Sequence, residues 1–153
     1  MNDHLDVDLR WLEVALEQAR TGADEGGVPI GAALVADGQL LGAGRNRRVQ
    51  HASPIHHGET DALAAAGRQP ASVYARATMY TTLSPCAMCS GAMLLYGIRR
   101  VVVGENRTFV GEEELLRSRG VEVVVLDDPE CRKLMDTFAA RHPQLWNEDI
   151  GEV

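Results

Sequence analysis

The sequence predicts an α/β fold in which helices cover a mixed five-stranded sheet. The chain has 153 residues, the length of one domain, and 45% of them are hydrophobic, which is enough to bury a core. The dipeptide Asp37-Gly38 between two short apolar runs is a strong β-hairpin signal. Later runs of strand length alternate with segments of helical periodicity, as in parallel strands joined by helices.

The first half of the chain contains four predicted elements. Leucine and alanine recur at helical spacing from Leu9 to Ala19, and Gly26-Gly27 ends this helix. Two strands flank the Asp37-Gly38 turn, and an alanine-rich run that stops at Gly67 predicts another helix. The elements are a helix at 9–19, strands at 30–36 and 40–44, and a helix at 59–66.

The second half continues the alternation. One helix ends at Gly97, valine-rich runs predict two buried strands, and a tail starts at Pro143. The elements are strands at 78–83, 100–104 and 121–126, and helices at 86–96, 112–118 and 130–141. Because no linker, repeat or low-complexity segment divides the chain, residues 1–153 are expected to form one domain.

Charge and cysteine content restrict the partners and the compartment. The formal net charge of −7 argues against a nucleic-acid partner, because such binding relies on Lys and Arg at phosphates. The N-terminus is acidic where a secretory signal is basic and then apolar, and we find no run long enough to span a membrane. Three cysteines, two of them in C-x-x-C, indicate a reducing compartment and a metal, so we expect a cytoplasmic protein.

One basic cluster stands apart from the acidic composition. Arg45-Asn46-Arg47-Arg48 follows a predicted strand. We expect it to be a solvated turn, since charged side chains usually stay at the surface. The alternatives are that this cluster contacts a phosphate group or another subunit.

Two short motifs predict a catalytic zinc site. His57-Gly58-Glu59 offers one imidazole, and Pro85-Cys86-Ala87-Met88-Cys89 offers two thiolates. Three protein ligands leave a fourth coordination position open, which is typical of catalytic zinc. The H-x-E and P-C-x-x-C pair is the signature of zinc nucleobase deaminases.

The local sequence also predicts how these ligands are held. We expect Ser84 to cap the helix that contains Cys86 in its first turn, with Cys89 one turn later on the same face. We expect His57 where a loop enters a helix, with Gly58 allowing close approach of a ligand.

Glu59 is expected to be the proton carrier rather than a ligand. In hydrolysis it would take a proton from the attacking water and pass it to the base, and then assist departure of ammonia. The alternatives are an ordinary first-turn glutamate and a non-catalytic zinc module. Cys131 lies in an apolar-periodic helix and is expected to be a buried thiol, and His56 a neighbour of the site or a surface residue.

The sequence resembles the fungal-type zinc-dependent cytosine deaminases of the cytidine deaminase-like superfamily. The likeness runs from residue 25 almost to the C-terminus and is most specific at Trp146 and at 148–152. The resemblance implies a three-layer α/β/α sandwich, a homodimer with one zinc per subunit, and conversion of free cytosine to uracil and ammonia in pyrimidine salvage. It also implies the residues that contact the base: Asn46 and Asp149 by hydrogen bonds, Phe109 and Trp146 as aromatic walls, Ile30 by apolar packing, Gly58, and the carbonyl of Ser84.

The tail at 143–153 is expected to close over the site. Trp146 and Ile150 are unfavourable in water, so they should dock on the body of the protein. Asn147 departs from the aromatic residue expected there in the fungal enzymes. The helix at 86–96 has little polar surface and is expected to contribute to a subunit interface.

Two other enzyme activities remain as alternatives to cytosine deamination. Deamination of another free base, such as guanine or isocytosine, needs only a changed pocket group. A tRNA adenosine deaminase would need a basic surface, for which the arginine cluster is the best support.

Overall fold

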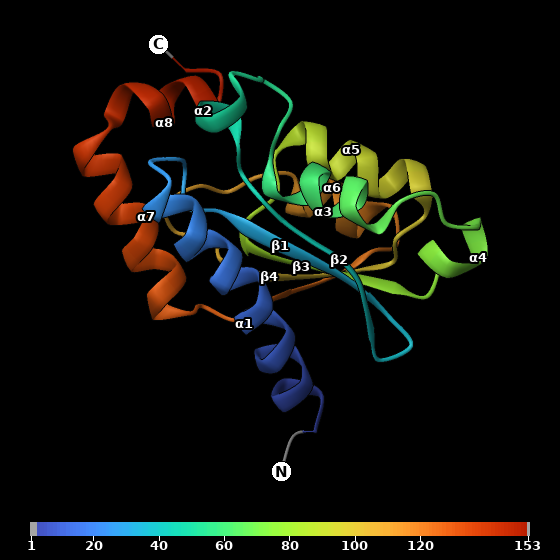
Figure 1. Ribbon diagram of the computed structural model, residues 1–153. Helices are drawn as coiled ribbons and strands as arrows, with labels where there is room; N and C mark the ends of the chain where they lie inside the picture. Colours follow the sequence, from blue (N-terminus) through green and yellow to red (C-terminus); the bar gives the residue numbers. More distant parts are fainter. Residues whose placement is uncertain (1–2, 153) are drawn as a thin grey trace.

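A mixed five-stranded sheet forms the centre of the computed structural model, which describes residues 3–152 (Figure 1). The strand order is β2-β1-β3-β4-β5. β1 pairs antiparallel with both β2 and β3, while β3, β4 and β5 run parallel. The strands are β1 (Gly31–Ala36), β2 (Gln39–Arg45), β3 (Ala77–Leu83), β4 (Arg100–Glu105) and β5 (Glu122–Val125). The predicted mixed sheet is confirmed; Met1, Asn2 and Val153, at the ends of the predicted domain, lie outside the described residues.

Helices cover both faces of this sheet, which gives the three-layer α/β/α arrangement (Figure 1). Ala32 and Leu34 of β1 point into a core with α3, α5 and α6, while Ala33 and Val35 point into a second core with α1 and α7. This alternation follows from the two-residue period of a strand. The helices are α1 (Asp3–Asp24), α2 (Arg48–His51), α3 (Gly58–Ala66), α4 (Ala71–Tyr74), α5 (Ala87–Tyr96), α6 (Glu113–Ser118), α7 (Pro129–Arg141) and α8 (Pro143–Asp149).

At the edge of the sheet, β2 packs closely against α3, the helix that begins at the site. An added Cβ at Gly44 would lie 2.4 Å from the backbone N of Ala62, and one at Gly42 would lie 2.4 Å from the backbone N of Ala66. Only glycine permits this approach of strand and helix backbones. The hairpin before β2 is confirmed, with positive φ at Asp37 and Gly38, as a type I′ turn requires.

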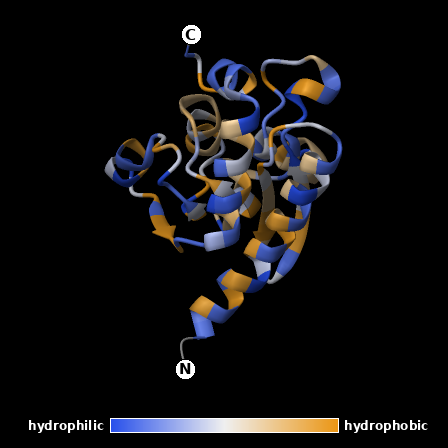
Figure 2. Ribbon diagram, turned by 90° about the vertical axis from the view of Figure 1, so that its left-hand side faces the viewer, coloured by the Kyte–Doolittle hydropathy of each residue, from blue (hydrophilic) through white to orange (hydrophobic). Residues whose placement is uncertain are grey.

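Four helices differ from the prediction. The first helix begins at Asp3 rather than at residue 9; Leu5, Val7 and Leu9 near its start are exposed and give no buried stripe. Figure 2 shows this end of the helix extending below the rest of the molecule. The short helices α2 and α4 were not predicted, because four residues give no periodic pattern. The tail from Pro143 contains the helix α8, with proline at its start.

Within residues 3–152, no helix is both long and apolar enough to cross a bilayer.

Candidate metal centre and substrate pocket

His57 lies where a loop enters α3, as predicted. It is the residue before the helix and has an extended backbone, with φ of −86° and ψ of 167°. Its backbone N–H donates to Thr60 Oγ1 at 3.0 Å, which fixes the start of the helix. Gly58 follows directly, and an added Cβ there would come within 3.3 Å of the Ile30 carbonyl oxygen. Glycine at this position therefore also lets α3 pack against the start of β1.

Cys86 and Cys89 lie at the start of α5, one helical turn apart. Cys86 itself is the N-cap residue, so the predicted cap at Ser84 is wrong. The Ser84 hydroxyl has other partners: it donates to Glu113 Oε2 at 2.6 Å and accepts from the Gly111 N–H at 2.8 Å. The prediction failed because Glu113 and Gly111 are distant in sequence and compete for this hydroxyl.

The three predicted ligands converge on one point. His57 Nδ1 lies 3.5 Å from Cys86 Sγ and 3.7 Å from Cys89 Sγ, and the ligand atoms of the three residues all lie within 4.8 Å of one another. For tetrahedral zinc with ordinary bond lengths, nitrogen and sulfur ligands are about 3.6 Å apart. The donor set and its spacing therefore fit zinc. Among residues 3–152, this is the only such cluster of histidine, cysteine and carboxylate side chains.

The thiols of Cys86 and Cys89 differ in pKa. Hydrogen bonds with Cys89 and His57 together lower the pKa of Cys86 to about 4, against the effect of burial. The hydrogen bond with Cys86 raises the pKa of Cys89, and burial adds to this rise. Metal ligands must be deprotonated, so a divalent cation that binds here displaces the remaining proton.

Glu59 lies beside the cluster without joining it. The residue is 4% exposed and follows Gly58 in the first turn of α3. Burial raises the pKa of Glu59 above its usual range, while the charge of His57 opposes this rise. A buried carboxylate next to a metal cluster, with a raised pKa, is suited to receive and return protons near neutral pH.

A small pocket opens beside the cluster, with a volume of about 20 Å³. All the predicted base-contacting residues line it, together with His57, Glu59 and Cys86. Leu83 also lines it and was missed, since a buried strand residue carries no distinguishing sequence signal. The residues predicted to contact the base are Ile30, Asn46, Gly58, Ser84, Phe109, Trp146 and Asp149, and Ile150 completes the wall of the pocket.

One wall of the pocket is polar and the other aromatic. Asn46 Nδ2 donates to Asp149 Oδ1 at 2.9 Å, and His57 Nε2 lies 3.5 Å from the same oxygen. Phe109 and Trp146 pack edge to face, with ring centroids 6.0 Å apart. Trp146 is buried with apolar residues from α7 and the strand ends, so the predicted docking of the tail is confirmed.

The arginine cluster is not a solvated turn, contrary to the prediction. Arg45 pairs with Glu25 at 2.8 Å, and Arg47 pairs with Asp61 at 3.2 Å. Arg48 lies 3.6 Å from Asp149. These acidic partners are distant in sequence or on another element, so charge counting along the chain could not find them.

The other singled-out residues lie near the site or in the core. His56 is half-buried and its Nε2 lies 2.7 Å from Asp61 Oδ1, so it neighbours the site without facing the metal cluster. Cys131 is buried against the sheet, as predicted. Glu113 was missed: it is 4% exposed and holds the Ser84 hydroxyl.

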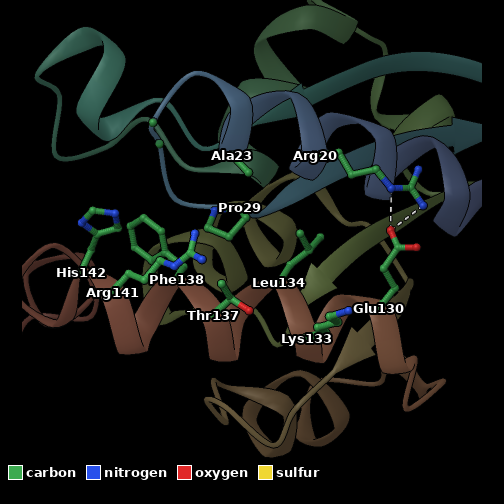
Figure 3. A pocket seen from close by; sticks show the side chains of 12 residues that line it. Arg20, Ala23, Pro29, Glu130, Lys133, Leu134, Thr137, Phe138, Arg141 and His142 are labelled. Atoms are coloured by element: carbon green, nitrogen blue, oxygen red, sulfur yellow. Dashed lines mark hydrogen bonds and ion pairs between the residues drawn. The ribbon is translucent and has the colours of Figure 1, made fainter.

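A larger groove of about 530 Å³ lies elsewhere, between α1 and α7 (Figure 3). Pro29, Leu134 and Phe138 form its apolar part, and Arg20 pairs with Glu130 at one end. It contains no cysteine and no buried acid beside a possible metal ligand. A second groove of about 540 Å³ lies beside Tyr74 and Tyr96, so size does not locate the chemistry, and the metal-binding side chains lie in the smaller pocket.

Comparison with known proteins agrees with this assignment of the site. Residues 5–105 match the family model described as the cytidine and deoxycytidylate deaminase zinc-binding region. The chain belongs to this family. The family's zinc binding, together with the cluster of His57, Cys86 and Cys89, identifies zinc as the cofactor.

Three similar proteins differ in what they are named for. A cytosine deaminase from Candida albicans is 55% identical over 146 residues, covering 95% of this chain and 97% of that protein. A tRNA-specific adenosine deaminase from Buchnera aphidicola is 38% identical over 100 residues, covering 65% of this chain and 66% of that protein. The structure of a guanine deaminase from Nitrosomonas europaea is 26% identical with a TM-score of 0.66, covering 85% of this chain and 83% of that chain.

Replacing a zinc ligand should remove the metal. We expect His57→Ala and Cys86→Ala to lose most bound zinc, because two remaining protein ligands hold the ion poorly. Cys131→Ala is the matched control, since that thiol is buried away from the cluster and its loss should leave zinc content unchanged. Elemental analysis after dialysis measures zinc per chain. Full zinc in the ligand variants would contradict the assignment.

Proposed function

We propose that the protein is a zinc-dependent cytosine deaminase that converts free cytosine and water to uracil and ammonia. The observation that carries the proposal is a buried Glu59 beside a three-residue zinc cluster, with both opening onto one closed pocket. The Candida albicans relative named cytosine deaminase, which matches 95% of this chain, supports cytosine as the base.

Glu59 moves the protons in the proposed reaction. Zinc held by His57, Cys86 and Cys89 would supply a Lewis acid that lowers the pKa of water to about 7. As the water oxygen bonds to C4 of cytosine, Glu59 accepts one of its protons and delivers it to ring N3. Glu59 then takes the proton of the hydroxyl at C4 and passes it to the amine, which leaves as ammonia as its bond to C4 breaks and the C4 carbonyl of uracil forms.

The pocket residues are proposed to hold the base in position for this transfer. Asn46 and Asp149 supply a donor and an acceptor on one wall, and Phe109 and Trp146 enclose a planar ring. Ile30 and Gly58 complete the surface next to the cluster, and the carbonyl of Ser84 is proposed to accept from the leaving amine. Paired polar groups in a closed pocket reject rings that lack the matching groups.

Residues 143–153 are proposed to act as a lid on this single zinc domain. Trp146, Asp149 and Ile150 of this segment line the pocket. The volume of about 20 Å³ holds about one water molecule, so a base can enter only if the wall moves. Movement of α8 would then govern substrate entry and product release.

The alternative substrates fit less well. Guanine is a larger, two-ring base that carries different polar groups, and it would have to match the same donor and acceptor of Asn46 and Asp149. A tRNA substrate needs cationic surface, yet Arg45, Arg47 and Arg48 are all engaged with acidic side chains of the chain itself. Isocytosine remains the closest competitor, because it is also a single ring with an exocyclic amine.

We also propose a homodimer in the cytoplasm. α5 exposes Leu95 at 74% and Tyr96 at 44%, which favours contact with a second copy. Sedimentation at micromolar concentration tests the dimer, and a stable monomer would contradict it.

A reducing compartment is proposed because Cys86 and Cys89 must remain thiolates to hold zinc.

Glu59→Gln separates metal binding from proton transfer. The amide is nearly the same size but cannot accept and return the proton, so we expect kcat for cytosine to fall by at least about 100-fold. Zinc content should stay at the wild-type value, because Glu59 lies outside the ligand cluster. Ammonia release and elemental analysis measure the two quantities. A variant with full activity would refute the role of Glu59.

A panel of bases tests the substrate. Ammonia release should be fastest from cytosine, and kcat/KM for guanine should be lower by at least about 100-fold, because its groups do not match the pocket. The panel should include isocytosine and a tRNA anticodon stem-loop containing adenosine. Higher kcat/KM for either of these than for cytosine would replace the proposed function with that alternative.

A further inference from the structure

Arg48 connects the pocket wall at α2 with the lid helix α8. Its Nη1 lies 3.6 Å from Asp149 Oδ1, and its Nη2 lies 3.6 Å from Glu148 Oε1. The side chains of Arg48 and Asp149 are 13% and 4% exposed, whereas Glu148 is 67% exposed. Shielded charges are screened less by salt than exposed ones, so the contact with Asp149 carries most of the interaction.

The backbone of the same residue orients Asn46. The Arg48 N–H donates to Asn46 Oδ1 at 3.1 Å. This contact occupies the carbonyl end of the side-chain amide, so its Nδ2 faces Asp149 Oδ1 and donates to it at 2.9 Å. An amide has one accepting and one donating end, so this contact sets which end points towards Asp149.

The guanidinium is not placed for maximal stability. Its Nε is buried and has no hydrogen-bond partner among residues 3–152. A buried donor without a partner lowers the free energy of unfolding, and an unbranched apolar side chain would fill the space without that cost. The arginine therefore needs a reason other than packing, and its contact with Asp149 provides one.

We propose that Arg48 is a positioning residue: its side chain holds Asp149 in place as the acceptor for Asn46 and keeps α8 closed over the pocket, while its backbone N–H, which the substitutions below retain, orients Asn46. Arg48 does not itself line the pocket and acts through two residues that do. The inference deepens the proposed function and rests on it for its kinetic consequence. Loss of the charge should weaken binding of the base, whereas proton transfer by Glu59 should continue once the base is bound.

The test replaces Arg48 with methionine and with lysine. In Arg48→Met, KM for cytosine should rise at least about tenfold, as expected when a charged contact is lost. Its kcat should stay within about threefold of wild type, because the zinc ligands and Glu59 are unchanged. Arg48→Lys keeps the charge and should recover most of the KM. Arg47→Met is the matched control, since Arg47 pairs with Asp61 rather than with α8.

A second readout follows the lid without substrate. In a Trp11→Phe background, Trp146 is the only tryptophan, and it is 7% exposed. Acrylamide quenching of its fluorescence should increase in Arg48→Met and stay unchanged in Arg47→Met, with zinc content equal in both.

The outcomes separate this inference from the proposed function. Unchanged KM, an equal effect in Arg47→Met, or unchanged quenching would overturn the role of Arg48. If no base is deaminated by the wild-type protein but Arg48→Met still exposes Trp146, the proposed function fails while Arg48 still holds the lid. Loss of kcat with unchanged KM would show that Arg48 affects chemistry rather than positioning, and would also overturn it.

Discussion

The site depends on the N-termini of α3 and α5, which lie next to each other and bring the metal-binding side chains together. His57 precedes α3 and Cys86 caps α5, and packing of both helices on one face of the sheet brings Nδ1 and Sγ to 3.5 Å. Residues that begin a helix have extended backbone, so their side chains leave the regular helical faces. This explains how Glu59, only two residues from His57, reaches the same pocket. The glycine contacts between β2 and α3 hold this arrangement.

The arginines near the site pair with carboxylates of the same chain. The arginines at and after the end of β2 pair with carboxylates just after α1, on α3 and on α8, and so connect this sheet edge to all three segments. Asp149 is the meeting point: Asn46, His57 and Arg48 all lie within 3.6 Å of its Oδ1. A carboxylate on α8 therefore contacts both the predicted zinc ligand His57 and the pocket wall, so the position of α8 and the shape of the pocket depend on each other.

Much of the fold and of the site is determined by residues that are close to one another in sequence. The hairpin at Asp37-Gly38, the individual strands and the C-x-x-C at a helix start depend on neighbours in sequence, and sequence reasoning found them. The position of the cap at Cys86, the partners of Ser84 and the arginine pairs depend on residues brought together by folding. No spacing rule reveals those contacts. The prediction that Asn46 and Asp149 line the pocket came from family resemblance, since each alone looks like an ordinary surface residue.

X-ray absorption at the zinc edge of the purified protein tests the central claim most directly. The account predicts one nitrogen and two sulfur ligands from the protein, at about 2.0–2.1 Å and 2.3 Å, plus one oxygen from solvent. Four protein donors around the metal, or no zinc in the folded protein, would contradict the account, because no position would remain at which water and base could meet.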